Sequence, residues 1–149
     1  MERNTETCST MPYTLPVVIV NDTEDALTVI EKTCWYYANG GAWTEDTGHK
    51  LTLILGGSGT SGMLRIRASS GHTFSVVVGY HHSDFWCDAQ VDLPDDDTAT
   101  KLHPEYYNGG KLSSEAYPSI ERKNSAGRMV KVHLQSLPCA IPPVIINYS

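Results

Sequence analysis

The residues with the clearest chemical meaning lie in a glycine-rich run, residues 53–65, in which four glycines and three hydroxyl side chains separate two apolar segments. Glycine is used where the backbone φ must be positive or where a ligand lies against the main chain, and a cluster of four costs entropy that a plain hairpin does not require. The run therefore predicts a place where a ligand comes close to the backbone. A glycine-rich hairpin with a bulge and no ligand is the alternative.

Three familiar glycine motifs can be compared with this run. Residues 57–62 fit the G-x-G-x-x-G pattern of dinucleotide sites, but the next residues alternate as in a strand, whereas such a site needs a helix there. A Walker phosphate loop needs Lys and then Ser or Thr after the last glycine, where this chain has Met63 and Leu64. A nucleophile elbow needs G-x-S-x-G, and Ser58 has its second glycine in the wrong place. These comparisons argue against nucleotide binding and against a nucleophilic serine.

Length and charge restrict the class of protein. A chain of 149 residues is expected to form one domain with its own core. A formal net charge of −6 argues against nucleic acids and anionic membranes as partners, because both are bound mainly through clustered Lys and Arg. The first residues lack the apolar core of a secretory signal, and no apolar run approaches the ~20 residues that span a bilayer. We therefore expect a cytoplasmic protein, unless a leader has been removed, and no membrane insertion.

The four cysteines, Cys8, Cys34, Cys87 and Cys139, are widely separated and have no zinc-site spacing. Two of them, Cys34 and Cys87, lie beside a tryptophan, which predicts packed free thiols; a disulfide framework is the alternative if the protein is exported. The acidic stretch Asp92–Asp97 lacks the spacing of a calcium loop and is typical of a solvated turn. No metal and no other cofactor is expected.

Short strand candidates dominate the chain. They are β-branched or alternating, turn residues separate many of them, and they cover residues 13–20, 51–55, 63–68, 73–81, 87–93, 129–135 and 144–148. This spacing predicts a mainly β fold, a β-sandwich of two antiparallel sheets with short connecting helices. Residues 24–38 have features of both helix and strand, and Glu105–Tyr107, before Asn108 and two glycines, predicts a short helix with a glycine stop.

Several blocks of the chain, in their order and spacing, resemble the fungal fruit-body lectin family. They are TCWYYANGGAW (33–43), the glycine-rich run (56–64), GYH (79–81), WCD (86–88), EYY (105–107) and GR (127–128). The similarity extends from Thr33 to about Val132, and the combination is far more specific than any single block. The resemblance implies a sandwich similar in topology to the actinoporin toxins, with residues 1–12 as an N-terminal extension and residues 13–149 as a single lectin domain.

The resemblance also implies a function. Members of the family bind the disaccharide Galβ1-3GalNAc without metal and without catalysis, form dimers or tetramers, and serve in defence or storage. The sugar-binding residues that it implies here are Ala38, Ser58, Gly59 and Asp88, and we add the neighbouring pair His81 and His82 to the predicted site. Sugars present dense, directional hydroxyls, so a site needs a carboxylate that accepts two bonds, small residues that let the backbone reach the ring, and a nearby aromatic side chain. These residue types fit that requirement.

The chain departs from the family at two places. His82 and Ser83 stand where the family usually has Asn and Tyr, so an amide is replaced by an imidazole, a group that changes charge near neutrality. We therefore expect disaccharide affinity to vary between about pH 5.5 and 7.5. Adjacent strand residues point to opposite faces, so one of His81 and His82 is expected to be structural. The family's second site, for N-acetylglucosamine, is expected to be impaired, because Val91 replaces a threonine and residues 109–124 are shortened.

Other readings remain open from the sequence. An actinoporin-like membrane-active protein would need an amphipathic N-terminal helix, and residues 1–12 offer no apolar stripe. A glycoside hydrolase using Asp88 would need a second carboxylate about 5 to 9 Å away, which a sequence does not show. The three tryptophans, Trp35, Trp43 and Trp86, are expected in the core rather than as platforms for a sugar.

Overall fold

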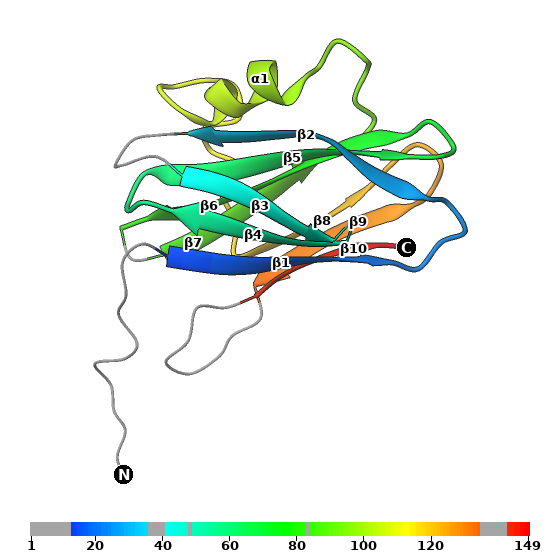
Figure 1. Cartoon of the computed structure of the whole chain (residues 1–149). Helices are drawn as coiled ribbons and strands as arrows, with labels where there is room; N and C mark the ends of the chain where they lie inside the picture. Colours follow the sequence, from blue (N-terminus) through cyan, green and yellow to red (C-terminus); the bar gives the residue numbers. More distant parts are fainter. Residues whose placement is uncertain (1–12, 36–40, 48, 83, 135–142) are drawn as a thin grey trace.

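The protein is a sandwich of two β-sheets with a short helical segment on one outer face (Figure 1). The computed structural model describes residues 13–35, 41–47, 49–82, 84–134 and 143–149. The strands are β1 (Tyr13–Asn21), β2 (Leu27–Trp35), β3 (Gly41–Thr47), β4 (Lys50–Leu55), β5 (Thr60–Ala68), β6 (Thr73–His81), β7 (Asp84–Gln90), β8 (Ser119–Lys123), β9 (Met129–Leu134) and β10 (Val144–Tyr148). The helical segment consists of α1 (Ala99–Leu102) and the 3-10 helix η2 (His103–Tyr106).

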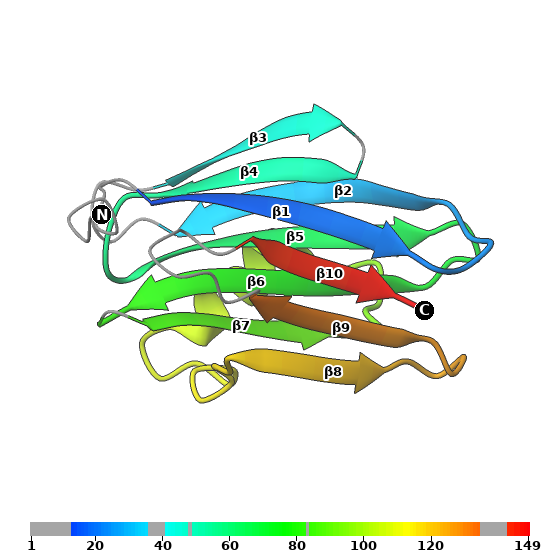
Figure 2. The ribbon, with the colours of Figure 1, turned by 90° about the horizontal axis from the view of Figure 1, so that it is seen from below.

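The two sheets differ in size and in strand direction. The larger has six strands in the order β3-β4-β1-β10-β9-β8, and the smaller has four in the order β2-β5-β6-β7 (Figure 2). All pairs are antiparallel except β1 and β10, which run parallel from Val17 beside Val144 to Asn21 beside Tyr148. The predicted mainly β sandwich is confirmed, and this central parallel pair corrects the prediction of purely antiparallel sheets.

The predicted strands are accurate where the sequence is most apolar. Strands β6 and β10 coincide with residues 73–81 and 144–148. Strand β7 runs from residue 84 to 90 rather than from 87 to 93, because the chain turns at Asp92, where φ is +56°. Residues 27–35 form a strand, which resolves the ambiguity of that region. Strands β3 and β8 were not predicted; they are edge strands rich in charged and polar residues, as sheet edges usually are.

The main core lies between the sheets. Apolar side chains of β1 and β4 alternate with more exposed residues, so that each strand buries one face. They pack against β5, β6 and β9 through a set that includes Leu15, Val17, Leu53, Leu55, Leu64, Ile66, Val76, Val78 and Val132, all 0–1% exposed. Burial of this apolar surface, at about 25 cal/mol per Å², is the main stabilising contribution to the fold.

The cysteines within the described residues belong to this packing. Cys87 is buried in the core, Cys34 is half-buried against it, and both are free thiols. Burial raises the pKa of Cys34 to about 11 and that of Cys87 to about 12, so both stay protonated and unreactive near neutral pH. The predicted packed thiols are confirmed at these two positions, while Cys8 and Cys139 lie outside the described residues.

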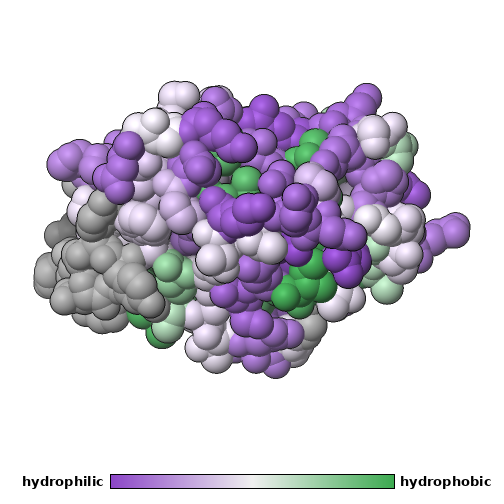
Figure 3. All heavy atoms as spheres, turned by 90° about the horizontal axis from the view of Figure 1, so that it is seen from above, coloured by the Kyte–Doolittle hydropathy of each residue, from purple (hydrophilic) through white to green (hydrophobic). Residues whose placement is uncertain are grey.

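Strands β5 and β6 are buried on both faces, because α1 and η2 cover the outer face of the four-stranded sheet (Figure 1). A second apolar cluster forms there, consisting of Met63, Val77, Ala99, Leu102 and Tyr106. The predicted helix at residues 105–107 thus begins earlier, at residue 99, and Pro104 lies in the first turn of its 3-10 part. From this side the surface is mainly hydrophilic, with small separate apolar patches (Figure 3).

Two charged residues of the sheet fasten this covering layer. The carboxylate of Glu31 accepts hydrogen bonds from the backbone N–H groups of Ala99 (2.8 Å) and Thr100 (3.2 Å) at the start of α1. The guanidinium of Arg65 donates to the carbonyls of Pro94 (3.2 Å) and Asp95 (3.1 Å) in the preceding turn. Orphan amides at a helix start need such acceptors, so the layer is held by defined contacts rather than by apolar packing alone.

The acidic stretch 92–97 forms turns, as predicted. The Asp92 carboxylate accepts hydrogen bonds from the N–H (3.0 Å) and hydroxyl (2.9 Å) of Ser125. Within the described part of the chain, no three His, Cys, Asp or Glu side chains are grouped as metal ligands. None of the helices described is long and apolar enough to cross a bilayer.

Candidate functional site

The glycine-rich loop between β4 and β5 lies against the turn between β6 and β7. The Gly59 N–H donates to the carbonyl of Tyr80 (2.7 Å), and the His82 N–H donates to Ser58 Oγ (3.0 Å). Gly59 has a φ of +91°, a conformation that strongly favours glycine. These bonds bring together Ser58, Gly59, His81 and His82, four of the six residues predicted for the site.

The glycines of the run serve different purposes. A Cβ placed on Gly62 would lie 2.5 Å from Leu53 Cδ1 and 2.8 Å from Trp43 Cζ2, so Gly62 makes room for core side chains. Gly59, in contrast, lines a cavity. At Gly62 the groups that come close to the backbone are therefore side chains of the protein's own core. At Gly59 the backbone is open to a ligand.

The two histidines lie side by side, which corrects the expectation that they face opposite ways. His81 is the last residue of β6, and the φ of His82 is +48°, so the alternation of a strand ends between them. Their ring centroids are 3.9 Å apart, with the planes at 61°. Both side chains are exposed, and the ring of His81 lies at the cavity.

Trp86 lies flat against the sheet because its cross-strand neighbour is Gly79. A Cβ on Gly79 would come within 2.4 to 2.5 Å of three atoms of the indole ring. The ring of Tyr106 lies next to it, with centroids 5.8 Å apart. Trp86 therefore packs against the second apolar cluster, as a core residue would, and also presents part of its surface to the cavity.

Of the other two tryptophans, Trp43 packs against the core as predicted, whereas Trp35 is half-buried outside both core clusters. Trp43 packs against the main core and donates from Nε1 to the carbonyl of Thr33 (2.9 Å). Trp35 stacks on Tyr107, with ring centroids 4.5 Å apart and planes at 7°. Tyr107 in turn lines the cavity, so Trp35 supports the cavity from behind.

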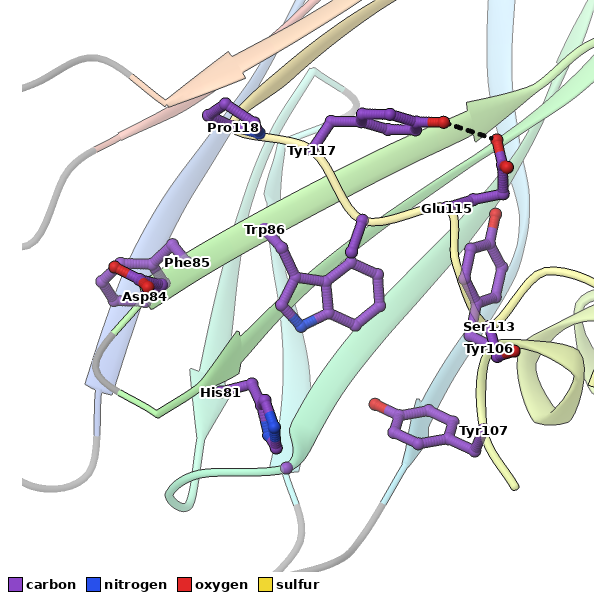
Figure 4. A pocket seen from close by; sticks show the side chains of 12 residues that line it. His81, Asp84, Phe85, Trp86, Tyr106, Tyr107, Ser113, Glu115, Tyr117 and Pro118 are labelled. Atoms are coloured by element: carbon purple, nitrogen blue, oxygen red, sulfur yellow. Dashed lines mark hydrogen bonds between the residues drawn. The ribbon is translucent and has the colours of Figure 1, made fainter. Parts of the chain in front are cut away.

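The cavity has a volume of about 580 Å³, within the range of about 300 to 1,000 Å³ typical of small-ligand sites (Figure 4). Its lining combines aromatic side chains with polar ones, among them Phe85, Trp86, Tyr106, Tyr107, Tyr117, His81, Asp84, Ser113 and Glu115. Figure 4 shows the Trp86 ring, the His81 ring and the hydroxyl end of Tyr107 around one space. Aromatic surface beside hydrogen-bonding groups suits a ligand with an apolar face and many hydroxyls.

Asp88 occupies a different environment from the other predicted residues. It is 0% exposed, and its carboxylate accepts hydrogen bonds from Arg122 (2.9 Å), the Tyr106 hydroxyl (2.6 Å) and Gln90 (2.8 Å). Burial, and then the charge of Asp88, raises the pKa of Tyr106, so this phenol stays a hydrogen-bond donor. A ligand could reach the carboxylate only if one of the three donors moved aside, and direct contact with a sugar stays a prediction.

Known proteins are similar to this chain in both sequence and architecture. The model of the family described as Fungal fruit body lectin matches residues 11–139. The chain belongs to the fungal fruit-body lectin family. Boletus edulis lectin, from Boletus edulis, is 43% identical over 101 residues, which cover 68% of this chain and 70% of that protein. Family membership makes this chain a carbohydrate-binding protein and not an enzyme.

The lectin's fold is similar to that of Xerocomus chrysenteron lectin XCL. The crystal structure of wild-type XCL has a TM-score of 0.85 at 31% identity and covers 93% of this chain and 100% of XCL. A form of XCL with three methionine substitutions gives a TM-score of 0.85 at 32% identity, with 95% and 100% covered. The recognition of the family from its sequence blocks is thereby confirmed.

The lectin's cavity has a charged border that sequence analysis did not predict. Arg122 bridges the carboxylates of Asp88 and Glu115 (2.9 Å each), and the hydroxyl of Tyr117 donates to Glu115 (2.9 Å). Hydrogen bonds from Tyr117 and Arg122 hold the pKa of Glu115 below its usual range, so its carboxylate is charged near neutral pH. The partners are up to 34 residues apart in the sequence, and no local pattern connects them.

Two residues that the sequence analysis names, Ala38 and Ser83, lie outside the described residues. Val91, which replaces a threonine of the family's second site, is half-buried and packs against the main core.

Proposed function

We propose that the cavity beside Gly59 and Trp86 binds glycans that carry Galβ1-3GalNAc, without a metal ion. One observation carries this proposal: the indole of Trp86 lies flat on Gly79, next to the exposed imidazole of His81 and the Gly59 loop, inside one cavity. The indole supplies an apolar surface for one face of a sugar ring. The loop and the imidazole supply hydrogen bonds for the hydroxyls.

The predicted residues have different roles in this proposal. Ser58, Gly59, His81 and His82 make the direct polar contacts, and Ala38, a sugar contact that the family resemblance implies, belongs to the same proposal. Asp88 contributes by holding Tyr106, whose side chain lines the cavity beside Trp86. Direct contact between Asp88 and the sugar is the alternative, and it requires Tyr106, Gln90 or Arg122 to release the carboxylate.

A glycan array with a metal chelator present, followed by calorimetric titration, tests the proposal. We expect selective binding of Galβ1-3GalNAc. Replacing Ser58 by Ala removes an exposed hydroxyl from the loop and should weaken affinity about tenfold, the effect of roughly 1.4 kcal/mol. Ser70→Ala is the matched control, because Ser70 is an exposed serine in the β5–β6 turn, where it donates to Asp25. Absence of binding across all glycans, or equal effects of both variants, contradicts the proposal.

We propose further that the second site, for N-acetylglucosamine, is lost or weak in this chain. The position of Val91 supports this proposal: it stands where the family has a threonine, is half-buried and packs against the main core, so it offers no hydroxyl to a sugar. An N-acetylglucosamine signal on the same array that Ser58→Ala leaves unchanged would contradict it.

Our proposal includes a homo-oligomer, a dimer or a tetramer, because multivalency raises avidity for surfaces that display many glycans. A cytoplasmic location and a role in defence or storage belong to the same proposal. Light scattering coupled to size exclusion tests the oligomer directly. A monomeric mass at the concentrations that agglutinate glycan-coated beads would contradict it.

A further inference from the structure

A row of four polar side chains begins at half-buried Thr33 and ends at the cavity. His103 Nδ1 lies 2.8 Å from Thr33 Oγ1, and His103 Nε2 lies 2.8 Å from Ser61 Oγ. Ser61 Oγ lies 2.5 Å from the hydroxyl of Tyr107. His103 is 2% exposed and Ser61 is 0% exposed, so the row is shielded from water over most of its length.

The members of the row come from different elements and meet only in the fold. Thr33 belongs to β2, Ser61 to β5 and His103 to η2, and Tyr107 follows η2. Tyr107 is fixed on its ring face by Trp35 and at its hydroxyl by Ser61. Figure 4 shows that this hydroxyl end is turned toward the cavity, so the row ends where a ligand would lie.

We propose that His103 is a positioning residue for this cavity: acting through Ser61, it fixes the place of the Tyr107 hydroxyl and lets that hydroxyl either donate to a ligand or accept from one. This inference rests on the function proposed above. His103 itself does not touch the ligand; it acts only through Ser61 and Tyr107.

A neutral imidazole carries one N–H and one lone pair, which gives the row two arrangements. With the proton on Nε2, His103 donates to Ser61, Ser61 donates to Tyr107, and Tyr107 turns its hydrogen toward the cavity. With the proton on Nδ1, Ser61 donates to Nε2, Tyr107 donates to Ser61, and the cavity meets an oxygen lone pair.

In both arrangements Thr33 supplies the complementary group at Nδ1, because its hydroxyl both donates and accepts. Burial lowers the pKa of His103 to about 4, so the ring is neutral near pH 7 and both arrangements are available. A charged ring would donate from both nitrogens and leave Tyr107 as a donor only. The neutral ring therefore lets one phenol serve sugar hydroxyls that donate as well as those that accept.

Two substitutions at one position separate this role from simple packing. In His103→Gln the amide replaces Nε2 and can still bond Ser61, whereas in His103→Asn the shorter amide replaces Nδ1 and reaches only Thr33. We expect affinity for Galβ1-3GalNAc to fall about tenfold in His103→Asn, the effect of one lost hydrogen bond, and to stay within about threefold of the unsubstituted protein in His103→Gln. Equal losses in the two variants would overturn the proposal.

A second measurement needs no sugar. The ring signal of Tyr107, followed by NMR with tyrosine labelled at Cζ with ¹³C, should shift in His103→Asn and in Ser61→Ala. Ser75→Ala is the matched control, since Ser75 is a fully buried serine of the same sheet whose hydroxyl has no hydrogen-bond partner among the described residues. It should leave both the signal and the affinity unchanged.

The two measurements distinguish the failure of this inference from that of the proposed function. If the unsubstituted protein binds no glycan, the proposed function fails, and the Tyr107 signal still tests the connection to His103. An unchanged signal in both His103→Asn and Ser61→Ala overturns the connection. A shifted signal with unchanged affinity overturns the role of the row in binding.

Discussion

The two walls of the cavity are built in different ways. The turn wall consists of Gly59 and His81, which line the cavity, with their neighbours Ser58 and His82, and it depends on backbone hydrogen bonds and left-handed φ angles in exposed turns. The ion-pair wall consists of three residues that line the cavity, Tyr106, Glu115 and Tyr117, with Asp88 and Arg122, which bond to them. It depends on side-chain hydrogen bonds around one buried carboxylate. Changes in the first should therefore alter binding with little effect on stability, whereas changes in the second should lower stability first.

The largest effect is expected at the centre of the ion-pair wall. Asp88→Ala should lower the free energy of unfolding by about 3 to 5 kcal/mol, because it leaves the partners of a buried ion pair uncompensated. Urea denaturation at pH 7 measures this loss. Asp95→Ala is the control: its side chain is 96% exposed and pairs only weakly with Arg67, so a change within about 0.5 kcal/mol is expected. A loss at Asp88 no larger than at Asp95 would remove the distinction between the walls.

The next effect concerns His103, which lies beneath the cavity. Its pKa falls from 6.5 to about 4 on folding, so the unfolded chain takes up a proton at a higher pH than the folded protein does. The free energy of unfolding should therefore decrease by about 3 kcal/mol from this residue as the pH falls from about 7 to about 4.

Comparison with His103→Gln isolates this contribution, because all carboxylates titrate in both proteins. Urea denaturation at pH 7, 5.5 and 4 should show a steeper loss in the unsubstituted protein. Parallel curves would mean that the pKa of His103 is the same in the folded and the unfolded protein, so that folding does not disfavour the charged ring.

A smaller effect on stability, with a large effect on binding, is expected on the turn wall. Gly59→Ala should cost about 1 kcal/mol through backbone strain, because φ is +91°, and should weaken glycan binding at least tenfold. Gly71→Ala provides a matched control in the β5–β6 turn: its φ is +105° and nothing lies within 4 Å of the added Cβ. It should cost similar stability and leave affinity unchanged. Equal affinity losses in the two variants would show that strain, and not position at the cavity, determines binding.

The smallest effect is expected at His82. Asn tolerates a φ of +48° well, so His82→Asn should change the free energy of unfolding by less than about 0.5 kcal/mol. Because an amide both donates and accepts hydrogen bonds, the affinity of this variant for Galβ1-3GalNAc should stay within about threefold of that of the unsubstituted protein. Calorimetric titration measures the difference. A larger loss would show that sugar binding requires the imidazole of His82 itself.

A feature of this fold can be predicted from the sequence when the residues that produce it lie close together in the chain. Strands β6 and β10 follow from their β-branched residues, and β3 and β8 escape detection because edge strands need few apolar side chains. The turn wall could be predicted because its residues lie in two short blocks. The pairing of Asp88 with Arg122 could not, since 34 residues separate them and only the packing of β7 beside β8 brings them together. The left-handed turn at His82 was also missed, because histidine is not a turn residue by type.

The central parallel pair of the six-stranded sheet has a consequence for how the chain folds. Strand β10, residues 144–148, lies between β1 and β9, so the sheet stays in two parts until β10 has been synthesised. Until then β1 and β9 each expose an unpaired edge, and such edges promote association between chains. Closure of the sheet by the most sequence-distant contacts also implies slow folding, since non-local pairing must overcome loop-closure entropy before it stabilises the fold. Completion of the β1–β10 ladder therefore has to wait until residues 144–148 have been synthesised.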